Sequence, residues 1–329
     1  MAEPLLDVVD LHVGFRIFEG YLKVLNGVRL AVDVGERVGL VGETGCGKTT
    51  IVKSVLRVLP VPPAKVTDGR IHYRGRDVLK MRRREAQALR RHELSAIFQD
   101  PLLSLNPVFT IGTQLRDIVR DSAIGKGKRL SHRAVEARCI DALRETGMPD
   151  AERIMTNYPI QLSGGMRQRV CIAEALSTNA NLLLADEPTT NLDVTIQDQI
   201  LRKLDELVDE HDASVVMITH SMGVVRDLTQ RANIMYAGSI VETGETRKLL
   251  EDPKHPYTQG LMASVPKLTG EGISEGIPGR IPNYLDPPSG CRFHPRCVHR
   301  MEVCSEEPPP FFEVGDDHRA ACYLYQEGT

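Results

Sequence analysis

The sequence predicts an α/β protein with a mainly parallel central sheet, an antiparallel β layer, a helical subdomain and a small cysteine-rich C-terminal extension. Three observations lead to this fold class. Short apolar runs alternate with longer amphipathic stretches over the first two hundred and fifty residues, and a mostly helical run interrupts this alternation. Four of the seven cysteines lie in the last forty residues.

The elements follow from the apolar patterns in chain order. "LDVVDLHVGF", "LNGVRLAV" and "GRIHYRG" predict strands of a separate antiparallel layer. "RVGLVG", "NLLLAD" and "SVVMIT" are continuous apolar runs, which are typical of parallel strands covered on both faces. The stretches "RRREAQALRRHEL" and "HRAVEARCIDALRETG" predict an inserted helical subdomain over residues 82–178, approximately.

The composition changes after Pro266. Nine of the twenty prolines lie in the final 64 residues, and the hydrophobic periodicity is lost. Such a segment cannot build a core from apolar burial alone, so it needs either a partner surface or a covalent or metal staple. We therefore predict two domains, residues 1–265 and residues 266–329.

Composition and charge exclude some function classes. With 41% hydrophobic and 26% charged residues and a formal net charge of -3, the chain has no general attraction to nucleic acid. The basic run 82–91 contains Glu85 and is followed by Glu93, which favours a solvated helix face. No run approaches the roughly eighteen apolar residues of a membrane span, and "MAEPLLDVVD" lacks the regions of a signal peptide, so we expect a cytosolic chain.

A phosphate-binding loop is predicted at "GLVGETGCGKTT", which follows an apolar strand and opens a helix. It fits the pattern G-x-x-x-x-G-K-[ST], whose glycines let several N–H groups and a helix N-terminus point at one anion. Lys48 is expected to bridge the β- and γ-phosphates, and Thr49 to offer its hydroxyl to Mg²⁺. The thiol of Cys46 is expected to be incidental.

Two acids end the predicted strand "NLLLADEP". Asp186 is placed to hold Mg²⁺ through water, and Glu187 to polarise an attacking water as general base. A strand that ends in Asp-Glu is weak evidence alone, because acidic residues often end strands. Together with the phosphate loop it indicates nucleotide hydrolysis.

The stretch "LSGGMRQRV" predicts a second anion-binding helix N-terminus, formed by Ser163, Gly164 and Gly165. The phosphate loop already surrounds its own ligand, so we infer that this helix serves a nucleotide bound to another subunit. An ordinary N-capped helix would explain Ser163 but not its coincidence with the other motifs.

These motifs resemble the nucleotide-binding subunits of ABC transporters. The signature "LSGGMRQRV" between a phosphate loop and "LLLADEP" is specific to that family. Gln99 in "FQDP" resembles the Q-loop glutamine, Asp193 in "TTNLD" the D-loop aspartate, and His220 in "VVMITHSM" the switch histidine. The resemblance implies a P-loop NTPase fold of the ABC type, in which ATP binding closes a head-to-tail dimer and hydrolysis reopens it.

The resemblance also implies roles for single residues. Gln99 reaches Mg²⁺ or the attacking water, Asp186 organises the metal, Glu187 acts as base, and His220 holds the γ-phosphate. Phe15, Phe18 and Tyr21 are candidates to stack on adenine, with Tyr21 favoured. The positions expected to contact ATP are Tyr21, Gly42, Glu43, Thr44, Gly45, Cys46, Gly47, Lys48, Thr49, Thr50, Gln99, Asp186 and Asp193, with Ser163, Gly164 and Gly165 completing the partner's site.

"FQDPLLSLNPVFTIG" and "EDPKHPYTQGLMASVP" resemble the peptide, nickel and oligosaccharide importer subfamily. This implies two transmembrane permease subunits, a second and different ABC ATPase chain, and an extracytoplasmic substrate-binding protein, at the cytoplasmic face of a prokaryotic membrane. Peptide is the commonest cargo, and the subfamily also includes importers of nickel and oligosaccharide.

Two hypotheses from different function classes compete with an importer subunit. The first is a soluble ABC-type ATPase without a membrane partner. Such proteins usually carry two ATPase units in one chain, or coiled-coil or zinc-hook insertions, whereas this chain has one unit and neither insertion. The second is a non-hydrolysing regulatory subunit, which conflicts with the presence of Glu187 and His220.

The C-terminal cysteines have the spacing C-x5-C-x6-C-x17-C. In a reducing compartment such a group favours a metal site over disulfides. Four thiolates suit Zn²⁺ or a [4Fe–4S] cluster, and gaps wider than the usual zinc pairs favour the cluster.

Dipeptide and oligopeptide importer subunits carry a similar extension, and some of them bind a [4Fe–4S] cluster. The resemblance implies that Cys291, Cys297, Cys304 and Cys322 are its ligands. His294, His299 and His318 are then bystanders or groups that support the ligands from outside, unless a mixed Cys/His zinc site recruits one of them. Cys139 and Cys171 lie in helical patterns and are expected to be buried thiols.

Overall fold

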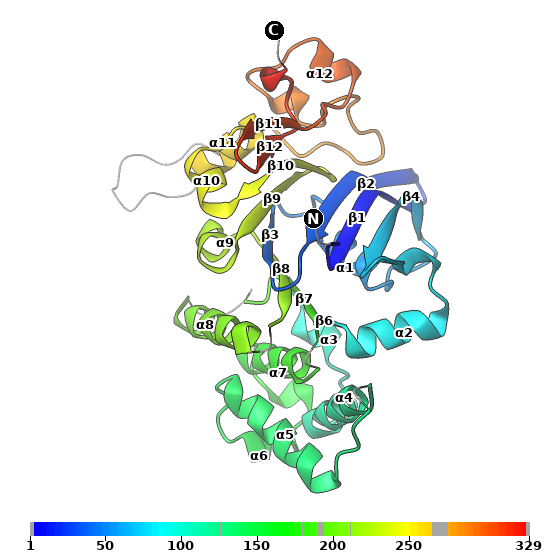
Figure 1. Cartoon of the computed structure of the whole chain (residues 1–329), viewed down its shortest axis with the longest axis vertical. Coiled ribbons are helices and arrows are strands. Elements are labelled where there is room, and N and C mark those ends of the chain that lie inside the picture. Colours follow the sequence, from blue (N-terminus) through cyan, green and yellow to red (C-terminus); the bar gives the residue numbers. More distant parts are fainter. Residues whose placement is uncertain are drawn as a thin grey trace. The chain divides into compact units, whose positions relative to one another are not determined.

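The chain folds into two compact units in a computed structural model that describes residues 3–125, 127–178, 180–189, 194–210, 212–264 and 276–326. The first unit comprises Met1–Asp33, Arg37–Lys80 and Ile218–Thr329, and the second comprises Val34–Glu36 and Met81–Met217 (Figure 1). The C-terminal segment 276–326 therefore belongs to the same unit as the N-terminal strands. The domain boundary expected after residue 265 lies outside the described residues and stays a prediction.

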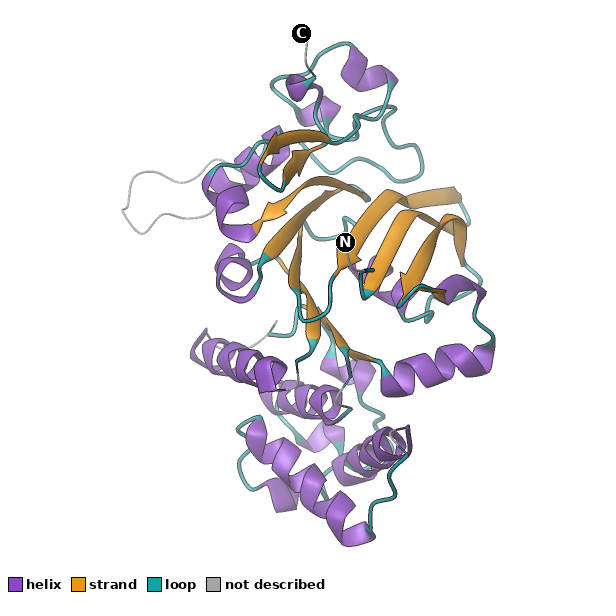
Figure 2. Cartoon of the chain, viewed as in Figure 1, coloured by secondary structure: helices purple, strands orange, loops and turns teal. Residues whose placement is uncertain are grey.

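The first unit contains both sheet and helix (Figure 2). Its elements are β1 (Leu6–Ile17), β2 (Gly20–Val32), β3 (Arg37–Val41), α1 (Lys48–Val55), β4 (Ala64–Tyr73), β5 (Arg76–Asp77), η1 (Val78–Lys80), α9 (Met222–Leu228), β9 (Arg231–Tyr236), β10 (Ser239–Glu245), α10 (Thr246–Glu251), α11 (Pro256–Ala263), η3 (His294–Arg296), α12 (Val303–Glu306), β11 (Phe312–Gly315), β12 (His318–Ala320) and η4 (Tyr323–Tyr325).

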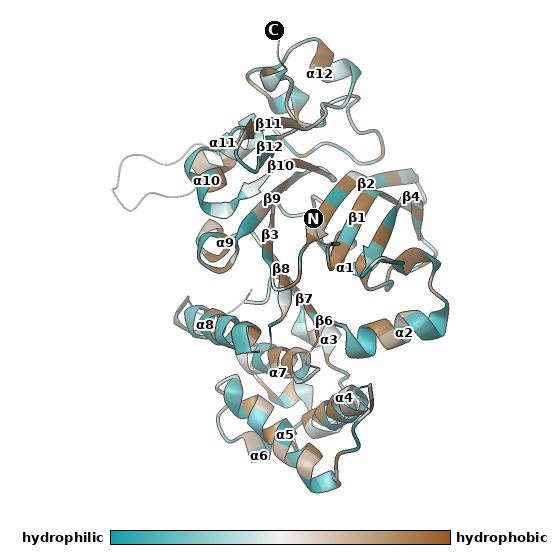
Figure 3. Cartoon of the chain, viewed as in Figure 1, coloured by the Kyte–Doolittle hydropathy of each residue, from teal (hydrophilic) through white to brown (hydrophobic). Residues whose placement is uncertain are grey.

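The predicted antiparallel layer is confirmed as a sheet with the order β2-β1-β4-β5. In β1, residue Leu6 faces Val32 of β2 on one side and Tyr73 of β4 on the other. Hydrophobic and hydrophilic residues alternate along β1 and β2 (Figure 3), and the buried ones include Leu6, Val8 and Leu11. This alternation places one side of each strand against the core.

The other strands of the first unit pair in the order β11-β12-β10-β9-β3. Strand β3, which leads into the phosphate loop, runs parallel to β9, from the pair Val38 and Arg231 to the pair Val41 and Ile234. Strands β9, β10, β12 and β11 pair antiparallel. The sheet is therefore mixed in direction, rather than parallel throughout.

The C-terminal segment contributes two strands that the sequence did not predict. Strand β12 pairs with β10 through Glu242 with Ala320 and Thr243 with Arg319, and Ala321 N–H donates to the Val241 carbonyl. The apolar pattern is too short here to indicate a strand, since β12 is three residues long. The partner surface that this proline-rich segment requires is the edge of β10.

An aromatic cluster also anchors the C-terminal segment. The Phe293 ring is 3% exposed and packs edge-on against Tyr236, with ring centroids 5.1 Å apart. Its centroid lies 5.5 Å from that of Tyr257, and Tyr236 and Tyr257 also contact each other, at 4.7 Å. Edge-on aromatic pairs add to the stability that comes from burying their area.

The second unit is mostly helical. Its elements are α2 (Arg83–His92), β6 (Leu94–Ile97), α3 (Pro101–Ser104), α4 (Ile111–Gly125), α5 (His132–Glu145), α6 (Ala151–Ile154), η2 (Pro159–Gln161), α7 (Gly164–Ser177), β7 (Leu182–Asp186), α8 (Val194–Glu210) and β8 (Ser214–Thr219), whose last residues belong to the first unit.

Helices α4, α5 and α7 share one apolar core. Ile111, Leu143 and Val170 are among its buried members. Cys139 and Cys171 lie in the same core, which confirms them as buried thiols. Strand β6, which the sequence did not predict, runs parallel to β7.

Polar features of the second unit also fit the sequence pattern. Helix α2 is largely hydrophilic (Figure 3), and its basic residues Arg83, Arg84 and Arg91 are exposed, as expected for a solvated face. Arg116 of α4 pairs with Glu136 of α5 through two hydrogen bonds of 2.6 and 2.9 Å, which lower the pKa of Glu136.

Every described helix of the protein is too short or too polar to cross a lipid bilayer.

Replacing Phe293 with alanine is expected to lower the free energy of unfolding by about 3–5 kcal/mol, because it leaves a cavity in the aromatic cluster. Urea denaturation of the full chain, followed by circular dichroism, measures the change. Phe311→Ala is the matched control, since the Phe311 ring is 36% exposed. Equal shifts of the two unfolding midpoints would contradict the anchoring role of Phe293.

Candidate functional site

The phosphate loop connects β3 to α1 within the first unit. Gly45 and Gly47 have φ angles of 86° and 110°, in the left-handed region that glycine adopts without strain. A Cβ atom on Gly42 would lie 2.1 Å from the Met235 carbonyl oxygen, so no side chain fits there. These three glycines let the loop curl tightly against strand β9.

Lys48 begins helix α1 and is only 6% exposed. Its Nζ donates to the carbonyl oxygens of Gly42 and Glu43, at 2.6 and 3.1 Å. The Sγ atom of Cys46 lies 3.8 Å from the same ammonium. Burial raises the pKa of the Cys46 thiol although Lys48 opposes this, so Cys46 is neutral near pH 7. Thr49 and Thr50 follow, half-buried, in the first turn of α1.

Residues distant in the sequence hold the loop from outside. Glu43 N–H donates to Tyr257 Oη at 3.1 Å, and Tyr284 Oη donates to the Gly45 carbonyl at 2.9 Å. Arg296 Nη1 pairs with Glu43 Oε2 at 3.2 Å. Sequence reasoning missed Tyr257, Tyr284 and Arg296, because they lie more than 200 positions from the loop and belong to no phosphate-binding pattern.

The three candidates for adenine stacking differ in exposure. The hydroxyl end of the Tyr21 ring lies against Gly14 of β1, since a Cβ atom on Gly14 would come within 2.4 Å of it. The Tyr21 hydroxyl is buried and has no hydrogen-bond partner among the described residues. Phe15 is half-buried on β1, and Phe18 is fully exposed at the turn before β2. Among these three rings, Phe18 leaves the most surface open to a ligand.

The second unit brings Gln99 and the two acids together. Asp186 ends the buried strand β7 and is 2% exposed, and Glu187 follows it at 8%. Glu187 has a φ angle of 49°, a left-handed conformation that is strained for a residue with a side chain. Gln99 Nε2 donates to Glu187 Oε2 at 3.2 Å. The Q-loop position and the proposed base are therefore direct neighbours.

The signature segment forms the N-terminus of α7 as predicted. Ser163 Oγ accepts a hydrogen bond from Met166 N–H at 3.3 Å, and Ser163 and Gly164 are exposed while Gly165 is half-buried. Further along the helix, Gln168 Nε2 donates to the Pro188 carbonyl, next to Glu187.

His220 belongs to the first unit, where it directly follows the end of β8, and it is exposed. Asp193 lies outside the described residues.

The four C-terminal cysteines line one small cavity. Cys291, Cys297, Cys304 and Cys322 contribute to its wall together with His294 and His299. Cys291 N–H donates to the Cys304 carbonyl at 2.9 Å, which joins the two halves of the cysteine segment. The cavity holds about 10 Å³, roughly the space of one water molecule. Burial, reinforced by the neighbouring thiols, raises the pKa of Cys291 to about 11.

The arrangement of these thiols does not amount to a formed metal site. Across the described ranges, no group of three or more His, Cys, Asp or Glu side chains is placed to hold a metal ion. The thiols share a cavity, but among the described residues they are not gathered around one ion. Binding of Zn²⁺ or of a [4Fe–4S] cluster would require the four thiols to move.

His318 does not line the cysteine cavity, so of its expected roles that of a bystander fits the structure and that of a zinc ligand does not. Its Nε2 lies 2.7 Å from Oε1 of Glu242, and both side chains are buried. Glu242 also accepts hydrogen bonds from the N–H groups of Lys254 and His255, at 2.7 and 2.9 Å. A buried carboxylate needs such partners, so His318 has a structural role on β12, the strand between β10 and the edge strand β11.

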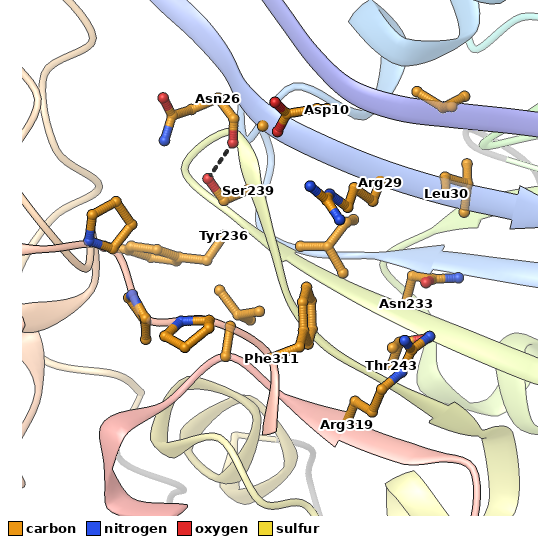
Figure 4. A pocket seen from close by; sticks show the side chains of 18 of the residues that line it. Asp10, Asn26, Arg29, Leu30, Asn233, Tyr236, Ser239, Thr243, Phe311 and Arg319 are labelled. Atoms are coloured by element: carbon orange, nitrogen blue, oxygen red, sulfur yellow. Dashed lines mark hydrogen bonds between the residues drawn. The ribbon is translucent and has the colours of Figure 1, made fainter. Parts of the chain in front are cut away.

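A larger cavity of about 750 Å³ lies between the antiparallel layer, β9, β10 and the C-terminal segment (Figure 4). Arg29, Asn233 and Arg319 line it, and Ser239 Oγ donates to the Asn26 carbonyl at 2.9 Å on one wall. None of its described lining residues belongs to the phosphate loop. Its size therefore does not identify it as the nucleotide site.

Comparison with known proteins identifies the family. Residues 25–190 match the family described as ABC transporter, and residues 241–304 match the oligopeptide/dipeptide transporter, C-terminal region. The oligopeptide transport ATP-binding protein OppD of Bacillus subtilis (strain 168) is 40% identical, over 97% of this chain and 88% of that protein. The dipeptide transport ATP-binding protein DppD of the same strain is 40% identical, over 99% and 96%.

A solved structure supports the same conclusion. A dimeric ATP-binding cassette in a post-hydrolysis state, bound to ADP and Pi, superposes with a TM-score of 0.66 at 25% identity, covering 74% of this chain and 99% of that one. The expected P-loop NTPase fold of the ABC type is confirmed. The chain is an ABC-type ATPase and belongs to the ABC transporter family, in the branch that includes the oligopeptide and dipeptide transport ATP-binding proteins.

Proposed function

We propose that the chain is the ATP-hydrolysing subunit that powers import of peptides through an ABC transporter. The main support is the similarity of nearly the whole chain to oligopeptide and dipeptide transport ATP-binding proteins. The similarity includes the C-terminal region of the oligopeptide/dipeptide transporter family. The chain works at the cytoplasmic face of the membrane with two permease subunits, a second ABC ATPase chain and an extracytoplasmic binding protein.

The phosphate loop binds the triphosphate of ATP. The backbone from Gly42 to Gly47 supplies N–H donors, and the start of α1 adds its positive end. Lys48 exchanges its contacts with the Gly42 and Glu43 carbonyls for phosphate oxygens. Thr49, Gln99 and Asp186 hold Mg²⁺, which supplies charge neutralisation when it is bound. Thr50 contacts phosphate, and Tyr21 or the more exposed Phe18 stacks on adenine.

Glu187 is the general base and Gln99 orients the water that attacks the γ-phosphate. Their contact supports these roles, because Gln99 fixes one carboxylate oxygen of Glu187. The strained backbone of Glu187 supports them too, since such strain clusters at functional sites. His220 holds the γ-phosphate, and Asp193 lies at the dimer contact.

The exposed N-terminus of α7 completes the nucleotide site of the partner ATPase. Ser163 Oγ and the Gly164 and Gly165 amides form the contact surface, and the exposure of Ser163 and Gly164 supports it. Gln168 connects this helix to Pro188, so closure of the dimer acts on the residue next to the base. Residues 1–265, with a helical subdomain at about 82–178, form the ATPase domain.

Residues 266–329 form a cysteine-rich extension whose four thiols hold a [4Fe–4S] cluster, with zinc as the alternative metal. The convergence of Cys291, Cys297, Cys304 and Cys322 on one cavity supports the site. A cluster would cross-link these positions. Loading requires the thiols to separate, and the exposed cavity residue His299 leaves that wall open to solvent.

Glu187→Gln is expected to reduce ATP turnover by at least about 100-fold while ATP binding persists, because the amide cannot accept the proton of water. Phosphate release and equilibrium ATP binding measure the two properties. Glu206→Gln, an exposed change on α8, is the matched control and should retain turnover. Brisk hydrolysis by Glu187→Gln would remove Glu187 from the role of base.

Anaerobically purified chain is expected to contain about four iron atoms and to absorb broadly near about 400 nm, as Cys-ligated clusters do. Cys291→Ser should lose this absorption, and Cys139→Ser should keep it, because Cys139 is buried in the helical core of the second unit. Metal analysis by mass spectrometry provides the count. One zinc per chain without iron would decide for the alternative metal.

Cells that carry Glu187→Gln are expected to lose uptake of labelled di- and oligopeptides and to retain uptake of nickel and of oligosaccharides. Peptide uptake fails because dimer reopening requires hydrolysis. The affinity-tagged wild-type chain should co-purify from membranes with two polytopic proteins and a second ATPase. Loss of nickel uptake alone would indicate that the cargo is nickel rather than peptide. Purification of the chain from the cytosol without membrane proteins would favour a soluble ATPase.

A further inference from the structure

Two side chains of the C-terminal segment, Tyr284 and Arg296, bind the phosphate loop directly. We propose that these residues, termed the loop clamp, are positioning residues for nucleotide binding. They hold the loop in its phosphate-accepting shape, and Arg296 neutralises the carboxylate of Glu43. The inference rests on the proposed binding of ATP at this loop.

Arg296 reaches the loop from within the unit. Its side chain is 7% exposed, and its Nη1 and Nη2 atoms lie 3.2 and 3.5 Å from the two carboxylate oxygens of Glu43. Nε donates to the Pro278 carbonyl and Nη2 to the Ile277 carbonyl, at 2.9 and 3.0 Å. The guanidinium also faces the ring of Tyr236, 5.6 Å from its centroid. These contacts therefore fix the position of the Arg296 guanidinium independently of its ion pair with Glu43.

Tyr284 holds the other side of the loop. Its hydroxyl donates to the Gly45 carbonyl at 2.9 Å, and its own carbonyl accepts a hydrogen bond from Lys23 N–H of β2 at 2.8 Å. Burial raises the pKa of Tyr284, so the hydroxyl stays protonated and donates at physiological pH. The Gly45 carbonyl is thereby held by a residue from outside the loop.

Both contacts act on the energetics of anion binding. Glu43 is a carboxylate inside a loop that receives a polyanion, and without a cation it would repel the phosphates. Arg296 removes that repulsion because the pair is mostly desolvated. The Tyr284 bond restricts an exposed glycine whose freedom would otherwise be lost on binding, so it lowers the entropic cost of binding.

The test is MgADP affinity of the full chain, measured by titration calorimetry. Arg296→Ala is expected to weaken binding about 10-fold and Tyr284→Phe about 3-fold, the ranges of a charged and a neutral hydrogen bond. Glu43→Gln combined with Arg296→Ala should restore affinity to within about 3-fold of wild type, because the uncompensated charge is gone. A purely structural role of Arg296, through Ile277 and Pro278, predicts no such rescue.

Two C-terminal residues offer matched controls. Tyr325 Oη donates to the Lys254 carbonyl at 2.8 Å, so Tyr325→Phe removes an equivalent hydrogen bond outside the loop. Arg319 pairs with Glu313, so Arg319→Ala removes an arginine of the same segment. Both variants are expected to bind MgADP as tightly as wild type.

Each outcome either supports the loop clamp or overturns it. Unchanged affinity in both Arg296→Ala and Tyr284→Phe, or an Arg296→Ala defect that Glu43→Gln does not relieve, would overturn it. If Arg296→Ala does not fold, the comparison of Tyr284→Phe with Tyr325→Phe decides, and equal affinities reject the inference. A folded wild-type chain that binds no MgADP would overturn the proposed function and the loop clamp with it.

Discussion

Residue Glu43 is bound at its amide, its carbonyl and its carboxylate, and the shape of the phosphate loop depends on these contacts. The amide donates to Tyr257, the carbonyl accepts from Lys48, and the carboxylate pairs with Arg296. The partners come from α11, from α1 and from the C-terminal segment. Tyr257 and Arg296 are themselves held against the ring of Tyr236. The position of the phosphate loop therefore depends on the packing of the aromatic cluster, through Tyr257 and Arg296.

The C-terminal segment combines three roles within a few residues. The turn η3, which carries Arg296, lies between Cys291 and Cys297, and Phe293 just before it is part of the aromatic cluster. Core packing, the contact with the phosphate loop and two of the four thiols thus share one stretch of backbone. Strand pairing with β10 and aromatic burial compensate for the shortage of aliphatic residues in this segment.

In the second unit, helix α7 has a different role at each of two positions. Its N-terminus presents Ser163 to solvent, and one side of it bonds to Pro188, which follows Glu187. Gln99 reaches the same glutamate from the segment after β6. The Glu187 backbone is left-handed, a strained conformation that persists because the surrounding contacts hold it. The exposed N-terminus of α7 is consistent with the proposed contact to a second ATPase subunit.

The sequence by itself determined the phosphate loop, the acids that end β7, the signature helix and the antiparallel layer. Each of these depends on a local pattern: glycines that permit φ angles near 86° and 110°, alternating burial, or an N-cap serine. Only the tertiary structure decided what touches the loop, that His318 pairs with Glu242, and that the C-terminal segment adds β11 and β12 to a sheet edge. These contacts join positions 76 to 253 residues apart, and no local pattern encodes such pairing. Proximity of the four thiols was predicted from their spacing, whereas the small volume between them depends on side-chain packing, which spacing does not specify.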